Sequence, residues 1–259
     1  MFFTEKKFTK VLDKYNYNFK TNDIIAGTIF SQEHEGYLVD IGNNKAAYLP
    51  KAEILLSNKN DPNINIHDTR EFFILVNDIE TNQLILSLKR LKYIRAWDRI
   101  KQMKEEDIIV KAYVKGVNKG GILIEIEDIQ GFIPNSHICY GKSKNQLYNT
   151  FISCKFLIAN EYNNQLVLSN RCAVITNIID KYNLKVGSII ISKIIKLTDF
   201  GIFFNIYNIP ALMHKSEISS YYNNNTDNIF EVGKELPIQI RHLDIKQGRI
   251  SISMTNIKN

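Results

Sequence analysis

The sequence predicts a mainly β protein built of three tandem copies of one small five-stranded barrel, joined by short α-helices. Three stretches of the chain repeat one pattern at intervals of about eighty residues, which indicates tandem copies of a small domain. Each copy consists of short apolar segments separated by turn residues, as expected for strands. With 259 residues, the chain has room for three units of roughly 65 to 75 residues each.

The repeats share a glycine, a step from an apolar residue to proline or histidine, and a closing strand. The closing strand reads QLILS in the first repeat, QLVLS in the second and RISIS in the third. The matching positions are Gly36, Leu49-Pro50 and 83–87 in the first repeat, Gly120, Ile133-Pro134 and 165–169 in the second, and Gly201, Met213-His214 and 249–253 in the third.

The third repeat shows the expected strands most clearly. Its β-branched and alternating segments predict strands at 188–195, 200–206, 211–213, 237–241 and 249–254. Gly248 predicts the hairpin turn between the last two strands. Five short antiparallel strands, with a long polar connection at 219–228 before the fourth, favour a closed Greek-key barrel of the oligonucleotide-binding (OB) type.

Amphipathic helices are expected between the barrels. From Leu88 to Lys104 apolar residues recur about every third position, with basic residues on the other faces, and residues 174–182 show a similar pattern. A weaker helix is expected at 4–15. The predicted organisation is an N-terminal helical segment at 1–21, barrels at 22–91, 106–171 and 184–259, and helical linkers at 92–105 and 172–183.

Composition and charge narrow the possible functions. The net charge of +6 is unevenly placed, because residues 22–90 carry 6 basic and 10 acidic groups while residues 184–259 are basic. A polyanion-binding surface spread evenly over all three repeats is therefore not expected. No run of about 18 apolar residues is present to span a membrane. The three cysteines form no CxxC pair and suit a reducing compartment.

The start of the chain predicts no targeting segment. It lacks the apolar stretch of a signal peptide, and Glu5 and Asp13 argue against an acid-poor transit peptide. The frequent Asn, Ile and Lys indicate an A+T-rich genome.

The segment from Asp199 to Phe204 is the sharpest local signal of chemistry. Alternate residues of a strand share a face, and Gly201 lets the strand bend, so Phe200 and Phe203 can reach one surface. Exposed aromatic rings on a barrel form a stacking platform for bases. We expect His214 to add a third ring, and we expect phosphate contacts from Lys193, Lys196, Arg241 and Arg249.

The alternative is that both phenylalanines are core residues, and comparison of the repeats weighs against it. At the Phe200 position the other copies have Glu35 and Lys119, which a core rarely accepts, so this position should face solvent. At the Phe203 position they have Leu38 and Ile122, so its exposure is less determined.

The third repeat resembles the S1 RNA-binding domain. The resemblance rests on Val186-Gly187, the segment 199–203, the segment 214–218, Val232-Gly233, Asp244 and the segment 248–251. It implies that the RNA face is lined by the residues Phe200, Phe203, His214, Asp244 and Arg249.

The whole chain is similar to the ribosomal protein S1 family, of the short three-domain kind found in cyanobacteria and plastids. Further matching segments are 46–50, 70–75, 93–97, 119–121 and 131–138. The resemblance implies a protein of the small ribosomal subunit that holds single-stranded mRNA, with the N-terminal part docked on the ribosome. It implies a location in the plastid stroma or a bacterial-type cytoplasm.

Repeats one and two depart from the RNA-binding pattern. Pro50 and Pro134 stand where the third repeat has His214. Likewise, Gln83 and Gln165 replace Arg249. RNA contact by the first repeat is therefore doubtful. The second repeat is a possible secondary RNA-binding site through Lys111, Lys115, Lys119 and Phe132.

An enzyme and a ribosome-free RNA-binding protein are the competing interpretations. Barrels of this type are appended to ribonucleases, but after the three repeats are assigned no stretch longer than about twenty residues remains for a catalytic domain. The five histidines show no metal-binding spacing. We therefore expect no catalysis, cofactor, metal or small-molecule substrate. A free RNA chaperone and an accessory subunit of an RNA-processing enzyme remain as alternatives.

Overall fold

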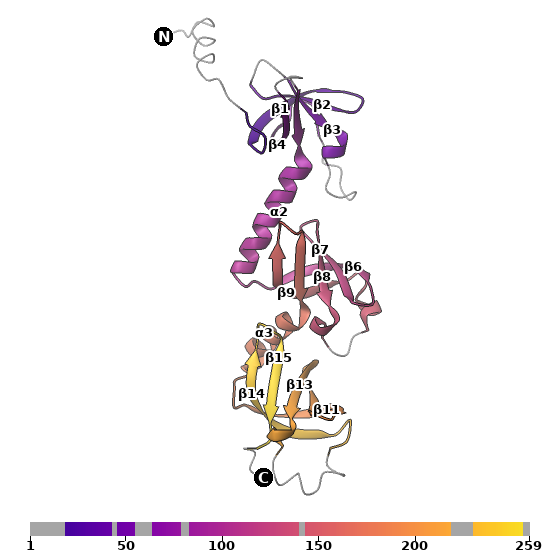
Figure 1. Ribbon diagram of the computed structural model, residues 1–259, viewed down its shortest axis with the longest axis vertical. Helices are drawn as coiled ribbons and strands as arrows, with labels where there is room; N and C mark the ends of the chain where they lie inside the picture. The colour runs from indigo at the N-terminus through magenta and orange to yellow at the C-terminus, as the bar shows by residue number, and fades with distance from the viewer. Residues whose placement is uncertain are drawn as a thin grey trace, which may run out of the picture. The chain divides into compact units, whose positions relative to one another are not determined.

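The computed structural model describes residues 19–42, 46–54, 64–78, 83–139, 143–218 and 230–255. The helix expected at 4–15 and the polar connection at 219–228 lie outside these ranges. Within the described part, the chain forms three closed five-stranded barrels and two α-helices (Figure 1), which confirms the predicted fold class. The chain divides into two compact units, one ending at Asp98 and the other beginning at Arg99.

Barrel 1 belongs to the first unit. Its strands are β1 (Ile24–Gln32), β2 (Gly36–Asp40), β3 (Ala47–Pro50), β4 (Thr69–Asp78) and β5 (Gln83–Ser87), with a short 3-10 helix η1 (Lys51–Glu53). The core contains Ile29, Val39, Leu49, Phe72 and Leu86, each fully buried.

Barrel 2 belongs to the second unit. Its strands are β6 (Val110–Val117), β7 (Gly121–Ile126), β8 (Ile129–Pro134), β9 (Phe151–Asn160) and β10 (Gln165–Ser169), with the 3-10 helices η2 (Asn135–His137) and η3 (Lys144–Leu147). Buried aliphatic residues such as Val114, Ile122, Ile133 and Leu168 fill its interior.

Barrel 3 completes the second unit. Its strands are β11 (Ile189–Thr198), β12 (Gly201–Ile206), β13 (Ile209–His214), β14 (Glu235–Asp244) and β15 (Arg249–Ser253), with the 3-10 helix η4 (Lys215–Glu217) after β13. Gly248 has φ of 66° in the β14–β15 turn, as the sequence predicts. Its core includes Phe204, Met213 and Ile252.

All three barrels have the same strand order. The first strand pairs with the second and fourth, and the fifth strand pairs with the third and fourth. The expectation of antiparallel pairing throughout is wrong at one place, because the third and fifth strands run parallel in every barrel. A closed ring with an odd number of strands cannot alternate direction all the way round, so one parallel pair is unavoidable.

The two helices follow barrels 1 and 2 directly. Helix α2 (Leu88–Glu105) begins immediately after β5, and helix α3 (Asn170–Tyr182) begins immediately after β10. Ser169 caps α3, since its Oγ accepts the backbone N–H of Cys172 at 3.1 Å. The helix ends at Asn183, which is in the left-handed conformation. No described helix has the length and apolar character needed to cross a membrane.

The strand register corrects the alignment of the second repeat by one residue. Gly36 pairs with Pro50 and Gly201 pairs with His214, and in barrel 2 the residue that pairs with Pro134 is Gly121, not Gly120. A Cβ atom at Gly121 would overlap the carbonyl oxygen of Ile133. The second strand therefore starts with a glycine because the neighbouring backbone passes too close for a side chain.

Candidate nucleic-acid interface

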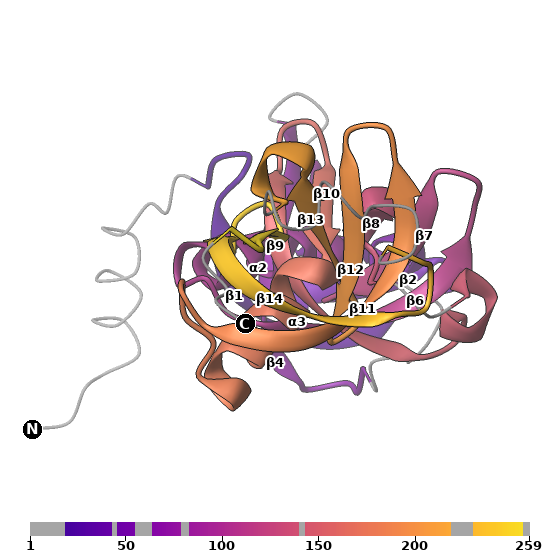
Figure 2. The same ribbon diagram turned by 90° about the horizontal axis from the view of Figure 1, so that it is seen from below.

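The outward side chains of β11, β12, β13 and β15 form one surface of barrel 3, which we call the outer face. Burial alternates along β12, where Ile202, Phe204 and Ile206 are buried while Phe203 and Asn205 are partly exposed. Figure 2 shows β12 and β13 running side by side in this barrel, in agreement with their six residue pairs. The outer face is thus a continuous sheet surface that solvent reaches.

Phe200 and Phe203 meet on this surface. Phe200 lies in the turn before β12 and is 53% exposed, which confirms the expectation that its position faces solvent. The ring centroids of Phe200 and Phe203 are 6.1 Å apart and the ring planes are nearly perpendicular at 89°. Edge-to-face contact of this kind holds both rings in place without burying either in the core. The interpretation of the two rings as core residues is therefore wrong.

The residues beside Phe203 extend the surface across neighbouring strands. Lys196 of β11 pairs with Phe203, which in turn pairs with Leu212 of β13, and Leu212 pairs with Ser251 of β15. Lys193 lies in the next row and pairs with Asn205. Lys193 and Lys196 are both exposed, so the structure brings them to the same face as the rings. Leu212 was not predicted, because its place beside Phe203 follows from strand register.

His214 lies close to Phe200. It is the last residue of β13, is exposed, and pairs with Gly201, while the backbone N–H of Lys215 donates to the carbonyl oxygen of Phe200 at 3.2 Å. The imidazole Nδ1 is 2.9 Å from Ser216 Oγ. This contact orients the imidazole, which remains exposed at the end of β13, next to the backbone of Phe200.

Asp244 and Arg249 lie at the other end of the outer face. They pair across the β14–β15 hairpin, and Arg249 is exposed. Asp244 Oδ1 accepts the backbone N–H of Gln247 at 2.9 Å, so this carboxylate holds the hairpin turn. Arg249 precedes Ile250, which pairs with Ala211, whereas His214 lies three residues further along β13.

Arg241 differs from the other predicted cations. It lies at the bulge between Ile240 and His242, and its guanidinium forms an ion pair with the carboxylate of Glu217. A phosphate at Arg241 would have to compete with this carboxylate. The structure thus separates Arg241 from Lys193, Lys196 and Arg249, which have no ion pair among the described residues.

Barrel 2 carries a related surface, but its aromatic residue lies on the third strand of the barrel, β8, and not on the second strand as Phe203 does in barrel 3. Leu123 occupies the Phe203 position and is 45% exposed, and it pairs with Phe132. Ile122, which was predicted to be the equivalent of Phe203, is fully buried. The register of β7 and β8 shows that the equivalent position is one residue later. Likewise, Gly120 and not Lys119 corresponds to Phe200. Barrel 1 repeats the arrangement with Leu38 and Tyr48.

The lysines predicted for barrel 2 do not form one group. Lys111 is exposed on β6, Lys115 lies at the β6 bulge and forms an ion pair with Glu125, and Lys119 lies in the bend between β6 and β7. Only Lys111 and Lys119 are therefore exposed, and they come from separate places on the barrel surface.

Barrel 2 also carries an aromatic pair, which the sequence analysis did not predict. Tyr113 of β6 pairs with Phe151 of β9, and their ring centroids are 5.3 Å apart. Phe151 is 68% exposed. The pair is not signalled by any local motif, since 37 residues of connecting chain lie between the two positions.

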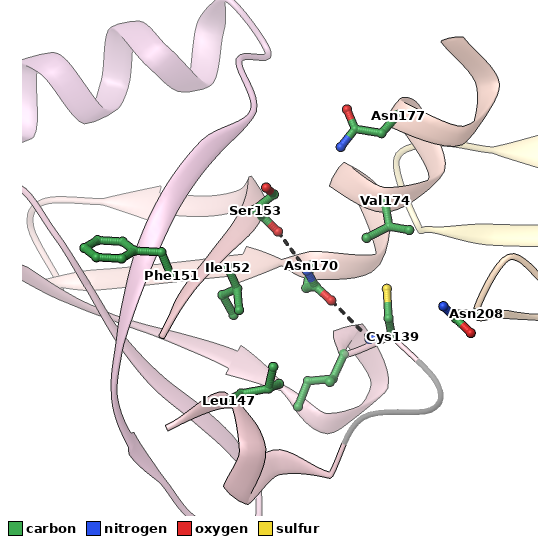
Figure 3. A pocket seen from close by; sticks show the side chains of 10 residues that line it. Cys139, Leu147, Phe151, Ile152, Ser153, Asn170, Val174, Asn177 and Asn208 are labelled. Atoms are coloured by element: carbon green, nitrogen blue, oxygen red, sulfur yellow. Dashed lines mark hydrogen bonds between the residues drawn. The ribbon is translucent and has the colours of Figure 1, made fainter. Parts of the chain in front are cut away.

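A pocket of about 440 Å³ lies beside Phe151 (Figure 3). Asn170 is central to it, because its Nδ2 donates to the carbonyl oxygen of Ser153 at 2.8 Å and its Oδ1 accepts the N–H of Cys139 at 3.3 Å. In Figure 3 the ring of Phe151 points away from the other labelled side chains. None of the lining residues carries a formal charge, so the pocket offers no cation to a phosphate.

Two observations on the described residues concern a buried thiol and the grouping of metal-ligating side chains. Burial raises the pKa of the Cys154 thiol, which is therefore kept in its unreactive neutral form. No three His, Cys, Asp or Glu side chains in the described ranges are grouped to hold a metal ion.

Comparison with known proteins agrees with the barrel architecture. The family described as "S1 RNA binding domain" matches residues 18–89, 104–148 and 183–255. Tandem OB barrels with this match define a protein of the S1-domain class. The chain belongs to the bS1 family of small ribosomal subunit proteins, of the plastid and cyanobacterial type.

Three relatives are similar to this chain, and the first two of them support the assignment. "Small ribosomal subunit protein bS1c" of Pyropia yezoensis is 44% identical, with 99% of this chain and 97% of the relative covered. "Small ribosomal subunit protein bS1A" of Synechocystis sp. is 39% identical over 99% of this chain and 78% of the relative. "Small ribosomal subunit protein bS1c" of Spinacia oleracea is 34% identical over 99% of this chain and 62% of the relative.

Proposed function

We propose that this chain binds single-stranded mRNA and holds it at the small ribosomal subunit for translation, with barrel 3 supplying the main RNA contacts. The observation that carries the proposal is the aromatic pair of exposed Phe200 and partly exposed Phe203 on the outer face, with His214 at one end and Arg249 at the other. Family membership supports the association with RNA and with the ribosome.

Stacking and charge neutralisation divide the work on the outer face. Bases stack on Phe200, Phe203 and His214, each stacked base contributing roughly 1–3 kcal/mol with little sequence preference. Lys193, Lys196 and Arg249 neutralise phosphates, so affinity falls steeply as salt rises. A platform of this kind accepts many messenger sequences, because every base has an aromatic face.

The direct test is the Phe203→Ala variant of the full-length protein. Loss of the ring removes one stacking surface and the support for Phe200, so affinity for a single-stranded RNA oligonucleotide should fall on the order of tenfold. Fluorescence anisotropy measures the affinity, and circular dichroism checks the fold. Tyr162→Ala is the matched control, since Tyr162 is fully exposed in a turn of barrel 2. Equal affinity of Phe203→Ala and the parent protein would refute stacking.

A free RNA chaperone remains the competing function. It would use the same outer face but would not stay with ribosomes. Sedimentation at moderate salt separates the two, because a ribosomal protein migrates with small subunits whereas a free chaperone remains at the top of the gradient. We propose the ribosomal function because the relatives carry ribosomal names, and the match covers 97% of the Pyropia yezoensis protein and 78% of the Synechocystis protein.

We further propose a non-catalytic role and a plastid location, in the stroma. The named relatives are ribosomal proteins. The frequent Asn, Ile and Lys residues indicate an A+T-rich genome, which fits a plastid. Recovery of the protein with ribosomes of isolated plastids would test the location, and recovery in the cytoplasmic ribosome fraction would contradict it.

A further inference from the structure

Two arginines and a histidine from three elements of the second unit lie around the first turn of α3. Arg171 lies in that turn, and Arg249 follows the β14–β15 turn of barrel 3. A Cβ atom at Gly248 would lie 3.1 Å from Arg171 Cβ, so the hairpin packs directly on the helix. Cys172 Sγ donates to the carbonyl oxygen of Lys246 at 3.3 Å and joins the same two elements. Figure 1 shows α3 beside β14 and β15.

Barrel 2 contributes the other side of this cluster. Arg171 Nη1 donates to the carbonyl oxygen of Ser136 in η2 at 2.8 Å. The neighbouring His137 has its Nδ1 3.0 Å from Ser169 Oγ, the side chain that caps α3. The 3-10 helix of barrel 2, the start of α3 and the hairpin of barrel 3 are therefore linked by hydrogen bonds and packing.

The acidic side chain nearest to this cluster is Asp244, which lies opposite Arg249 in the hairpin and acts electrostatically on Cys172. Arg171 and Arg249 take part in no ion pair among the described residues, and Arg171 Nε is buried there without a hydrogen-bond partner. Burial lowers the pKa of the Arg171 guanidinium, although the nearby thiols of Cys139 and Cys172 oppose this and Arg249 adds to it. Burial also lowers the pKa of His137, and the charges of Arg171 and Arg249 act in the same direction. Asp244, across the hairpin from Arg249, accepts the N–H of Gln247.

We propose that Arg171 and Arg249 together bind a phosphate of the RNA, at a site shared by α3 and the β14–β15 hairpin, with His137 beside it. The inference rests on the proposed function of barrel 3 and extends its RNA path beyond the barrel. Two guanidiniums with unused donors suit a phosphate, because each presents N–H groups in a planar fork. The positive end of the α3 dipole adds to the attraction.

The cluster of Arg171, Arg249 and His137 lies at the Arg249 end of the outer face. His214 lies near Phe200 at one end of the outer face, and Arg249 lies at the other end. The parallel register of β13 and β15 places Arg249 four residues before the level of His214, which corresponds to roughly 13 Å along the strands. RNA that stacks on the phenylalanines and passes Arg249 meets Arg171 next. The nearby pocket in Figure 3 does not compete for the phosphate, because its lining is uncharged.

The salt dependence of RNA binding tests the site in the full-length protein. Arg171→Gln should reduce the slope of log Kd against log salt by about 0.7, and should weaken binding of a single-stranded 12-nucleotide RNA about fivefold at 0.1 M salt, as one lost phosphate contact requires. Lys181→Gln is the matched control, because it removes one positive charge from the last turn of the same helix. An unchanged slope in Arg171→Gln, or an equal change in both variants, would overturn the proposal.

The Arg171→Lys variant separates phosphate contact from a structural role. Lysine keeps the charge but not the fork that reaches Ser136, so a phosphate contact predicts a slope close to that of the parent protein. A slope that falls as far as in Arg171→Gln would show that Arg171 acts only by positioning η2, contrary to the proposal.

The pKa of His137 provides a second readout. A bound phosphate favours the imidazolium form, so NMR titration should show this pKa rising when RNA is added, and rising less in Arg171→Gln. No shift on saturation with RNA would exclude a phosphate at this place. Phe203→Ala distinguishes the two proposals. If Phe203→Ala weakens RNA binding while Arg171→Gln does not, only the phosphate site at Arg171 and Arg249 is refuted. If neither variant weakens binding, both proposals are refuted.

Discussion

At the scale of single residues, one glycine in each barrel sets the geometry of the outer face. Gly36, Gly121 and Gly201 each start the second strand at a point where the facing backbone leaves no room for a side chain. In barrel 2 the ring of Phe132 also covers Gly121. In each barrel an aromatic or large aliphatic residue lies diagonally opposite this glycine, two residues before its strand partner, and fills the space that the missing side chain leaves.

Neighbouring glycines of barrel 2 should therefore respond differently to substitution. We expect Gly121→Ala to lower the free energy of unfolding by about 1–3 kcal/mol, because the new methyl group meets backbone that cannot move aside. Gly120→Ala is the control and should be tolerated, since its nearest contacts are at 3.6 Å and its φ is not positive. Urea unfolding measures both. Similar losses in the two variants would contradict the pairing of Gly121 with Pro134.

At the scale of elements, α3 acts as part of barrel 3 and not only as a linker. Ile175 and Ile178 belong to the core of barrel 3 together with Phe204 and Ile252. Tyr182 at the helix end stacks on Tyr207 of the β12–β13 turn, with ring centroids 4.2 Å apart and planes within 8°. The helix thus closes one end of the barrel with apolar side chains, and Arg171 in its first turn packs against the β14–β15 hairpin.

A fragment of barrel 3 should consequently need this helix. We expect residues 170–259 to be more stable than residues 184–259 by about 3–6 kcal/mol, the contribution of burying two isoleucines. Within the longer fragment, Ile178→Ala should be destabilising while the exposed Asn177→Ala should be nearly neutral. Denaturant unfolding decides this, and equal midpoints for the two fragments would show that α3 only connects the barrels.

At the scale of the whole molecule, the two compact units differ in charge and surface chemistry. The first unit contains barrel 1, whose segment 22–90 carries 6 basic and 10 acidic groups. The strand registers show which residues of barrel 1 occupy the positions of the proposed RNA site of barrel 3. Glu35 replaces Phe200, Pro50 replaces His214, and Gln83 replaces Arg249. A surface that repels phosphate fits attachment to protein better than a grip on RNA. The second unit contains the outer face and the cations at α3.

This difference predicts that residues 1–105 are sufficient for attachment to ribosomes. We expect the fragment to pellet with small subunits as the full-length protein does, because its acidic barrel and basic flanking segments offer charges of both signs to ribosomal proteins and rRNA. Residues 106–259 serve as the control and should pellet only when the subunits carry mRNA. A fragment 1–105 that remains in the supernatant would contradict the assignment of docking to the first unit.

The sequence by itself determined the repeated barrels, the helices between them and the exposed position of Phe200, because periodicity, turn residues and comparison of repeats are local properties. Only the tertiary structure decided the one-residue register at Gly121, the pairing of Tyr113 with Phe151 and the ion pair that occupies Arg241. It also decided the packing of Arg171 against the hairpin that carries Arg249. These depend on which strands and turns become neighbours when each ring closes, and residues distant in sequence leave no mark of that proximity in their local pattern.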